Sequence, residues 1–500
     1  MSNPLAGIVV LTRHGDRQGF YQSPKTYTAS NTNLTVLGYR QQLFNGQDLR
    51  ARYLLPTSPT AIGGIDSDVA ENAQLSVLAD AGGEGGVIVE SSLALLQGFY
   101  PPYDESITLA NGTSVDWSGR VQLIPVETVE PEQSIAMEPW TDCRAWTQRL
   151  NKWYGSSEFK QKAAEANAFY DSIQGLLGSR PRLLENAWNI YDFLNVERIH
   201  DSTLAPQITD DILRQAGTWA NYHETVSFSD ADPKDIGNVA GQAMLSLLLD
   251  GIAATANATD PLKVNILAAS YKPFLSLFKM LSIPQLEDNL IDYASTMVFE
   301  VYADQTVQVV YRNGSSGAFE PYPILGASSG SGVKVSDMED RLRPYTISTL
   351  AQWCDACSTT DARGCEALYR LNGTGSDHGV PVTSTYGQHA VSPVVAGLIG
   401  AMVTLALGAA LLGALAFFTG SSLTLAPSLA RRKSRAEAAA AAGSEGGGAA
   451  ARTSTNFASR FGGRESLRSA ISLQADTLAG QETGKTSFEL LQSPSRDAKQ

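Results

Sequence analysis

Basic residues are scarce in this chain of 500 residues, which has 37 Lys and Arg against 51 Asp and Glu and a net charge of −14. The deficit lies in residues 1–430, because residues 431–500 are net basic. Nucleic acid binds to basic surfaces, so an acidic body of this kind argues against nucleic acid as a partner. It does not exclude a small anionic ligand, because a local pair of arginines binds an anion on an acidic protein as well.

Cysteine is also rare, with four residues at Cys143, Cys354, Cys357 and Cys365. An even number outside the cytosol predicts two disulfides, and three pairings remain open. The first part of a zinc-site spacing is present in Cys354-x-x-Cys357, with Cys365 and His378 further on, but the later spacing fits no familiar site. We therefore expect disulfides, and no metal or other cofactor.

Charge is absent from one long stretch, the 25 residues Val394–Phe418, which are mostly apolar. As a helix this stretch would extend about 37 Å, enough to cross a hydrocarbon core of about 30 Å. A buried core helix is the alternative. The basic cluster at residues 431–435 follows the stretch, whereas residues 379–393 have no Lys or Arg. The positive-inside rule therefore predicts a cytosolic C-terminus and an N-terminal region that is extracellular or lumenal.

No export signal is recognisable, because the apolar segment Leu5–Leu11 is too short. An exported N-terminal region needs such a signal, so we expect the natural start to lie upstream. The alternative is a tail-anchored protein with this region in the cytosol, which would require the basic cluster to be translocated. Sequons for N-glycosylation all precede the apolar stretch and give possible acceptors at Asn33, Asn111, Asn257, Asn313 and Asn372.

The most informative motif is Arg13-His14-Gly15-Asp16-Arg17, which follows the apolar run of residues 7–12. That run predicts a short buried strand. Guanidinium groups present paired donors that match phosphate oxygens, and an imidazole nitrogen can accept a phosphoryl group and pass it to water. The alternative is an ordinary charged loop after a strand.

The segment LTRHGDRQGFY resembles the signature of the histidine phosphatase superfamily, most closely its branch of acid phosphatases and phytases. The resemblance covers roughly residues 7–320. It implies an α/β fold, a phosphoglycerate mutase-like three-layer sandwich with an inserted helical cap domain. It also implies that His14 is the phosphorylated nucleophile, that Arg13 and Arg17 bind the phosphate, and that the substrate is a phosphorylated small molecule.

A second strand–loop–helix unit is predicted at residues 263–281, and residues 296–312 are predicted to form a hairpin. In open α/β sheets, sites gather at the carboxyl ends of strands, so the loop at residues 269–272 should face the His14 motif. The resemblance implies a His-Asp pair in this loop, whose aspartate protonates the leaving alcohol. This chain has Ser270, Tyr271 and Lys272 instead, a degenerate proton-donor slot. A further arginine that the resemblance implies within residues 66–74 is also missing.

Several groups remain candidates for the missing acid. Tyr271 is a weak donor at its ordinary pKa of about 10, and Lys272 offers only charge. His223-Glu224 is an imidazole–carboxylate pair, although such a pair more often marks a surface helix end. His200-Asp201 is a literal His-Asp pair, but it follows a helix, and we interpret it as a helix boundary with a capping residue. The remaining carboxylic acids considered are Asp16 and Glu71.

The predicted organisation is a histidine-phosphatase-like ectodomain at residues 1–375, with an α/β core at about 5–125 and 260–345 and a helical cap at about 140–256. A stalk at 376–392, a transmembrane helix at 393–419 and a disordered cytosolic tail at 420–500 follow. Two functions remain. One is a membrane-anchored phosphomonoesterase acting through a phosphohistidine. The other is a catalytically impaired relative that binds phosphorylated ligands or serves as a scaffold. The sequence leaves the oligomeric state open.

Overall fold

The computed structural model of the chain describes residues 3–19, 32–81, 86–129, 134–287, 289–328 and 330–371. These ranges belong to one compact unit, Met1–Val380. The predicted stalk, transmembrane helix and tail, together with Asn372 and His378, lie outside the described residues.

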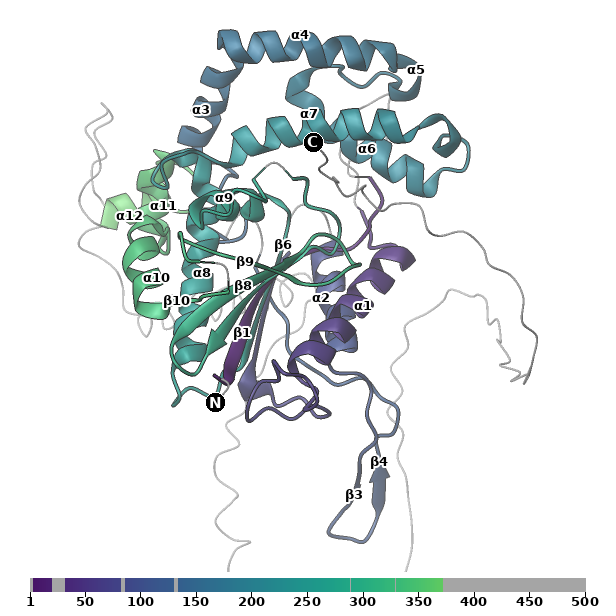
Figure 1. The fold of residues 1–500 in the computed structure, drawn as a ribbon, viewed down its shortest axis with the longest axis vertical. Coiled ribbons are helices and arrows are strands. Elements are labelled where there is room, and N and C mark those ends of the chain that lie inside the picture. The colour runs from purple at the N-terminus through teal and green to yellow at the C-terminus, as the bar shows by residue number, and fades with distance from the viewer. Residues whose placement is uncertain are drawn as a thin grey trace, which may run out of the picture. The chain divides into compact units, whose positions relative to one another are not determined.

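A central sheet of mixed direction organises the unit, with the strand order β10-β8-β7-β1-β6-β2-β5 and with β9 paired to β8 (Figure 1). Strands β1, β6, β2 and β5 are parallel, and β7 and β8 are the antiparallel hairpin that the sequence predicts beside β1. Across the central ladder, Arg13 at the end of β1 is opposite Ala269 at the end of β6. The strands are β1 (Leu5–Arg13), β2 (Leu75–Asp80), β5 (Glu127–Val129), β6 (Val264–Ala269), β7 (Thr296–Tyr302), β8 (Thr306–Arg312), β9 (Glu320–Tyr322) and β10 (Val333–Lys334).

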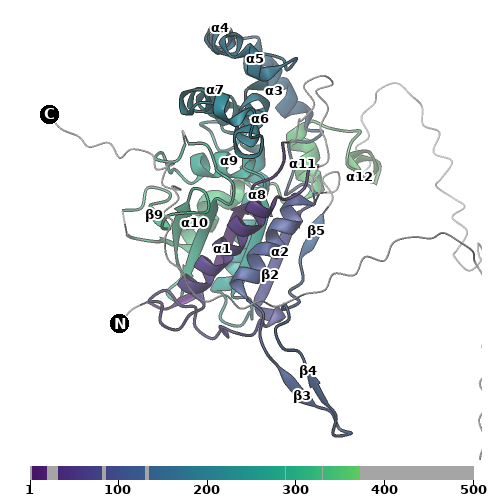
Figure 2. The ribbon, with the colours of Figure 1, turned by 90° about the vertical axis from the view of Figure 1, so that its right-hand side faces the viewer.

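Both faces of the sheet are covered, because the central strands are apolar at successive positions and each face buries alternate residues. Ile8 and Val10 of β1 pack with side chains of α1 (Val36–Tyr53) and α2 (Val87–Phe99). Val9 and Leu11 pack on the other side with α8 (Val239–Ala256) and α9 (Lys272–Met280). The result is a helix–sheet–helix sandwich, as the fold prediction requires (Figure 2).

A helical insert lies over the end of the sheet to which β1 and β6 point (Figures 1 and 2). Its own core is separate from the sheet cores and joins Phe159, Tyr170, Ile190 and Ala216. Its helices are α3 (Arg144–Tyr154), α4 (Ser157–Ser172), α5 (Gln174–Leu177), α6 (Ala187–His200) and α7 (Asp210–Phe228). The hairpin of β3 (Ser106–Thr108) and β4 (Ser114–Asp116) projects from the opposite end.

Two expected boundaries differ from the structure. The predicted cap extends to residue 256, but α8 packs on the sheet, because its apolar residues on all sides suit a layer between the sheet and α9. The apolar sequence that starts at Gly85 predicts a strand followed by a helix, but α2 begins at Val87, and the preceding strand is β2. Val87 and Ile88 are buried as residues of the first helical turn.

Of the described helices, one, at Ile236–Ala256, has the length and composition to cross a membrane, and 72% of its apolar window is buried inside the protein. A core helix passes the same test, so this helix is weak support for a membrane span. The C-terminal part of the unit contains α10 (Val335–Leu342), α11 (Leu350–Cys357) and α12 (Cys365–Leu371).

Candidate active site

The motif of residues 13–17 lies where β1 ends beneath the insert. Arg13 is the last strand residue, and the chain then packs closely against the start of α1. A Cβ atom on Gly15 would lie 2.4 Å from the carbonyl oxygen of Gly38, so only glycine fits this approach. Gly15 therefore brings the backbone of the motif close to the start of α1.

His14 is almost completely buried, with 1% of its surface exposed, and its ring centroid lies 5.6 Å from that of Tyr293. Its Nδ1 is 2.8 Å from the carbonyl oxygen of Gly15. A carbonyl oxygen only accepts hydrogen bonds, so Nδ1 carries the proton and Nε2 carries the lone pair. This tautomer makes Nε2 the nucleophilic nitrogen of the ring.

The Arg13 guanidinium is surrounded by aromatic rings. Its Cζ lies 4.6 Å from the ring centre of Tyr293, 5.4 Å from that of Tyr271 and 5.6 Å from that of Trp188. One of its nitrogens also donates a hydrogen bond to the carbonyl oxygen of Ile291. Cation–π contacts keep a guanidinium charged and oriented where little water reaches it.

Arg17 forms a buried ion pair with Asp192 of α6. Its Nη1 lies 3.1 Å from both carboxylate oxygens, and Arg17 is 1% exposed. The carboxylate therefore contacts the same guanidinium that the resemblance assigns to phosphate. A bound phosphate would share Arg17 with Asp192 or take its place.

Asp16 connects the motif to the insert through His200, the last residue of α6. The Nε2 atom of His200 is 2.7 Å from Oδ2 of Asp16, and the Thr35 hydroxyl donates to the same oxygen. Burial raises the pKa of Asp16, while the hydrogen bond from Thr35 and the charge of His200 oppose the rise. His200 also lines a surface hollow with Gln18 of the loop after the motif.

The degenerate proton-donor slot follows β6 as predicted. Tyr271 is 4% exposed, its ring stacks on Trp188 with centroids 3.8 Å apart, and its hydroxyl donates to Oε2 of Glu224 at 2.6 Å. Lys272 begins α9, and its ammonium lies 4.7 Å from the Trp140 ring centre and 5.5 Å from that of Tyr271. Ser270 is buried beside them.

His223 and Glu224 lie inside the molecule, in contrast to the surface helix end that is the usual setting of such a pair. His223 Nδ1 is 2.7 Å from Glu224 Oε1, and His223 Nε2 is 2.9 Å from the hydroxyl of Tyr154 at the end of α3. Burial raises the pKa of Tyr154, and nearby carboxylates add to the rise. The pair therefore contacts the slot through Tyr271.

Other predicted residues lie away from this cluster. Residues 66–74 precede β2 and so belong to the opposite end of the sheet from Arg13; the loop that follows β2, residues 81–86, contains no arginine. Disulfides join Cys143 to Cys357 and Cys354 to Cys365, which resolves the open pairing and takes up all four thiols. Asn33, Asn111 and Asn257 are exposed.

Asn313 is exposed too, but its amide is already engaged. Its Nδ2 donates to the carbonyl oxygen of Leu290 at 3.0 Å, and its Oδ1 accepts from the backbone N–H of Asp292 at 2.9 Å. A glycan on this nitrogen would have to disturb that turn. Asn313 is therefore the least suitable acceptor among the described sequons.

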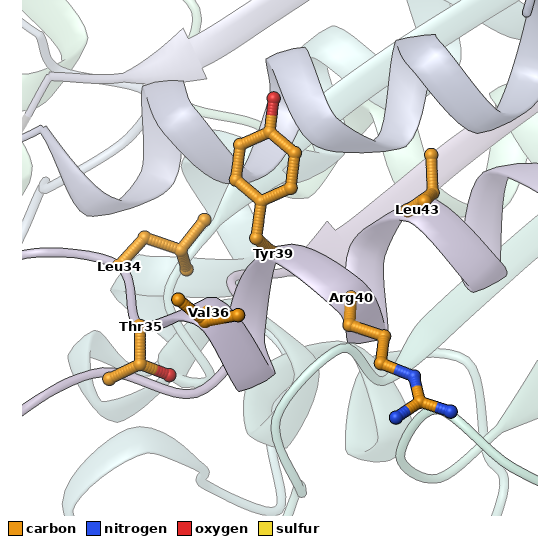
Figure 3. Close-up of a pocket in the computed structure, with 6 residues that line it drawn as sticks. All are labelled: Leu34, Thr35, Val36, Tyr39, Arg40 and Leu43. Atoms are coloured by element: carbon orange, nitrogen blue, oxygen red, sulfur yellow. The ribbon is translucent and has the colours of Figure 1, made fainter. Parts of the chain in front are cut away.

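A pocket of mainly apolar lining lies at the start of α1 (Figure 3). Tyr39 and Leu43 point to one side of the helix there, while the Arg40 guanidinium points away from them. Its lining includes Thr35 but not Arg13, His14 or Arg17. The pocket adjoins the motif through Thr35, and Arg40 is the charged residue in its lining.

Two contacts of the site could not be found by scanning the sequence. His200 contacts Asp16 and Asp192 contacts Arg17, and each of these contacts joins the insert to a residue more than 170 positions away. The sequence offers a weak signal for these two contacts. Asp192 and His200 are polar residues eight positions apart on the predicted cap, and both lie in α6.

No protein-family model matches the chain. Lysosomal acid phosphatase of Xenopus laevis is 25% identical over 372 residues, which are 72% of this chain and 80% of that protein. Human lysosomal acid phosphatase is 24% identical, over 63% of this chain and 72% of that protein. Human testicular acid phosphatase is 23% identical, over 64% of this chain and 75% of that protein.

Among solved structures, the phytase of Citrobacter braakii is similar with a TM-score of 0.47 and 13% identity, covering 69% of this chain and 98% of that chain. The phytase of D. castellii has a TM-score of 0.44 and 14% identity, covering 75% of this chain and 86% of that chain. The signature at the end of β1 and the similarity to lysosomal acid phosphatases over most of their length support the histidine phosphatase superfamily, in its acid phosphatase branch.

Proposed function

We propose that the chain hydrolyses phosphomonoesters through a phosphohistidine at His14. By its relationship to the acid phosphatases the chain is a phosphatase, and the proposal assigns the reaction to residues. The observation that carries it is the placement of Arg13, His14 and Arg17 together at the carboxyl end of β1, beneath the insert. Sites of open α/β sheets gather at this edge.

In the proposed reaction, Nε2 of His14 attacks the phosphorus atom and the ester oxygen leaves as an alcohol. The hydrogen bond between Nδ1 and the Gly15 carbonyl oxygen holds the reacting tautomer and stabilises the positive charge that develops on the ring. Water then attacks the phosphohistidine, releasing phosphate and restoring the imidazole. The guanidiniums of Arg13 and Arg17 supply the positive charge for the equatorial oxygens.

Substrate that binds at Arg17 meets the carboxylate of Asp192. Both carboxylate oxygens lie 3.1 Å from Nη1 of Arg17, so a phosphate either shares this guanidinium with Asp192 or displaces it. Because Asp192 is on α6 of the insert, a small outward shift of α6 would expose Arg17.

A second candidate, binding of a phosphorylated ligand without turnover, is favoured by one observation. The slot after β6 has Ser270 and Tyr271 where the resemblance implies a His-Asp pair. Loss of a general acid costs about 10²- to 10⁴-fold in rate. A protein that keeps the guanidiniums and loses the acid would bind phosphate and hydrolyse slowly.

We also propose that a single helix at residues 393–419 anchors the protein, with the catalytic unit lumenal or extracellular. Support comes from the charge-free run, from the basic cluster after it and from the sequons. Two disulfides in the described unit are typical of an oxidising compartment. The acid phosphatases to which the chain is similar are named as lysosomal proteins, which is consistent with a lumenal catalytic unit.

The test is a phosphoenzyme trap with the full chain in detergent. Wild type, mixed with labelled p-nitrophenyl phosphate and quenched in alkali, should retain one acid-labile, alkali-stable label, which His14→Ala abolishes together with turnover. His389→Ala is the matched control, because it removes a histidine far along the chain from the motif. Calorimetric phosphate binding without turnover from about pH 4 to pH 8 would instead establish the second candidate.

A further inference from the structure

A chain of four hydrogen-bonded side chains joins the insert to the slot after β6. Tyr154 contacts His223 Nε2 at 2.9 Å, and His223 Nδ1 contacts Glu224 Oε1 at 2.7 Å. The second carboxylate oxygen of Glu224 accepts the Tyr271 hydroxyl at 2.6 Å. Each group in the chain can hold or pass a proton. None of these contacts is needed to bind phosphate.

The chain is buried along most of its length. Exposed fractions are 7% for His223, 6% for Glu224 and 4% for Tyr271. Burial of polar groups costs free energy unless each one is hydrogen-bonded, and a satisfied buried network holds its members in fixed positions. Aromatic rings complete the enclosure: Tyr154 stacks on His223, and Trp188 stacks on Tyr271. A proton in this network is therefore shielded from bulk water.

The network ends at the phosphate site. Tyr271 is the second residue after β6, and Ala269 of β6 is the ladder partner of Arg13. The Tyr271 ring centre lies 5.4 Å from Cζ of Arg13 and 5.5 Å from Nζ of Lys272. Two cations beside the ring favour the phenolate that forms when Tyr271 gives up its proton.

We propose that Tyr271 protonates the leaving alcohol and that Glu224 and His223 are positioning residues which resupply its proton. The inference rests on the proposed phosphatase function and names the acid for it. As the bond from phosphorus to the ester oxygen breaks, that oxygen takes the Tyr271 proton, and Tyr271 takes a proton from the His223–Glu224 pair. When water attacks the phosphohistidine, its proton returns along the same path.

His200 and Asp16 form the other imidazole–carboxylate contact near the motif, but their surroundings indicate a different role. The backbone oxygen of Asp16 accepts from the N–H of Thr35, and Thr35 caps the first turn of α1. The Asp16 carboxylate accepts from the same threonine side chain. The contact therefore fastens α6 to the start of α1, on the side away from the loop that follows β6.

The test measures how rate depends on the leaving group. In Tyr271→Phe, which keeps the ring stacked on Trp188, kcat/KM for ethyl phosphate should fall by about 10²- to 10⁴-fold. For 2,4-dinitrophenyl phosphate, whose leaving group departs without a proton, it should stay within about threefold of wild type. Glu224→Gln should show the same pattern with a smaller loss. Tyr170→Phe is the matched control, because it removes another buried tyrosine hydroxyl from the core of the insert.

The ratio of the two rates does not depend on how much of a variant is folded. If Tyr271→Phe left the ratio of the two kcat/KM values unchanged, the assignment of Tyr271 as the acid would be overturned. Wild-type turnover and the phosphoenzyme at His14 would be unaffected by that result. Absence of turnover and of phosphoenzyme in wild type would instead remove the proposed function, and the acid with it. If Glu224→Gln left the ratio of kcat/KM for the two esters unchanged, the His223–Glu224 pair would not resupply the proton of Tyr271.

Discussion

The loops after β1 and β6 occupy equivalent places on neighbouring parallel strands, yet they differ in where their chemistry originates. Arg13 at the end of β1, and His14 and Arg17 in the loop after it, lie within five positions of the chain. The loop after β6 lacks the His-Asp pair that the resemblance implies, and its Tyr271 hydroxyl donates to Glu224, 47 positions away. Under the proposed mechanism, phosphate binding is therefore set by residues close together in the chain, whereas proton delivery depends on the helical insert.

Arg17→Lys should give the largest effect on the β1 side. A lysine keeps the charge beside Asp192 but loses the planar donors that match phosphate, so kcat/KM should fall by about 10²- to 10³-fold. The loss should be equal for good and poor leaving groups, unlike that of Tyr271→Phe. Arg149→Lys, at the ion pair with Asp230 in the insert, is the matched control. If the loss of kcat/KM in Arg17→Lys grew with the basicity of the leaving group, the loop after β1 would also take part in proton delivery, and the two loops would not differ in this respect.

Asp192→Asn should act in the opposite direction. It removes the carboxylate that competes for Arg17, so inorganic phosphate should inhibit about tenfold more tightly, or about 1.4 kcal/mol. The leaving-group dependence should stay that of wild type, because no proton donor has changed. The measurement is the competitive inhibition constant of phosphate at fixed pH. Weaker inhibition would mean that Asp192 orients Arg17 for phosphate and does not compete with it.

Asp16→Asn should give the smallest effect, a change in how the free energy of unfolding depends on pH. Burial raises the pKa of Asp16 above its ordinary value of 3.8, although Thr35 and His200 oppose the rise. The folded state then holds this proton more tightly than the unfolded state, so the stability it contributes is present below pH 3.8 and is lost as pH rises through the folded pKa. Denaturant unfolding should therefore show wild type losing stability relative to the variant over that window.

The same variant also probes the comparison directly. If Asp16→Asn made the rate depend on the leaving group as expected for Tyr271→Phe, proton delivery would belong to the β1 loop. An unchanged ratio for the two esters would leave Asp16 as a fastening point between α6 and α1.

Sequence alone predicted the parts of the site that depend on neighbouring residues. The apolar run before Arg13, the strand before Ser270 and the helix from Lys272 are all local patterns, and the structure has them as β1, β6 and α9. The pairing of these strands also follows from general rules for α/β sheets.

The rest depends on distant contacts that leave no periodic signal in one chain. His200 meets Asp16 across 184 positions, and Asp192 meets Arg17 across 175. His223-Glu224 was a candidate, but its burial could not be read from the residues around it. The strand expected at Gly85 failed because Val87–Val89 are apolar in a way that suits either a strand or a buried helical turn.

The bridge between Cys143 and Cys357 closes a loop of the polypeptide that contains the whole insert and most of the second half of the sheet. A protease that cuts the backbone anywhere inside this loop would not release a fragment, because sulfur would still join the two pieces. A chain cut once inside this loop would therefore keep both halves of its candidate site on one covalent molecule. On a denaturing gel, such nicking would become visible only after reduction.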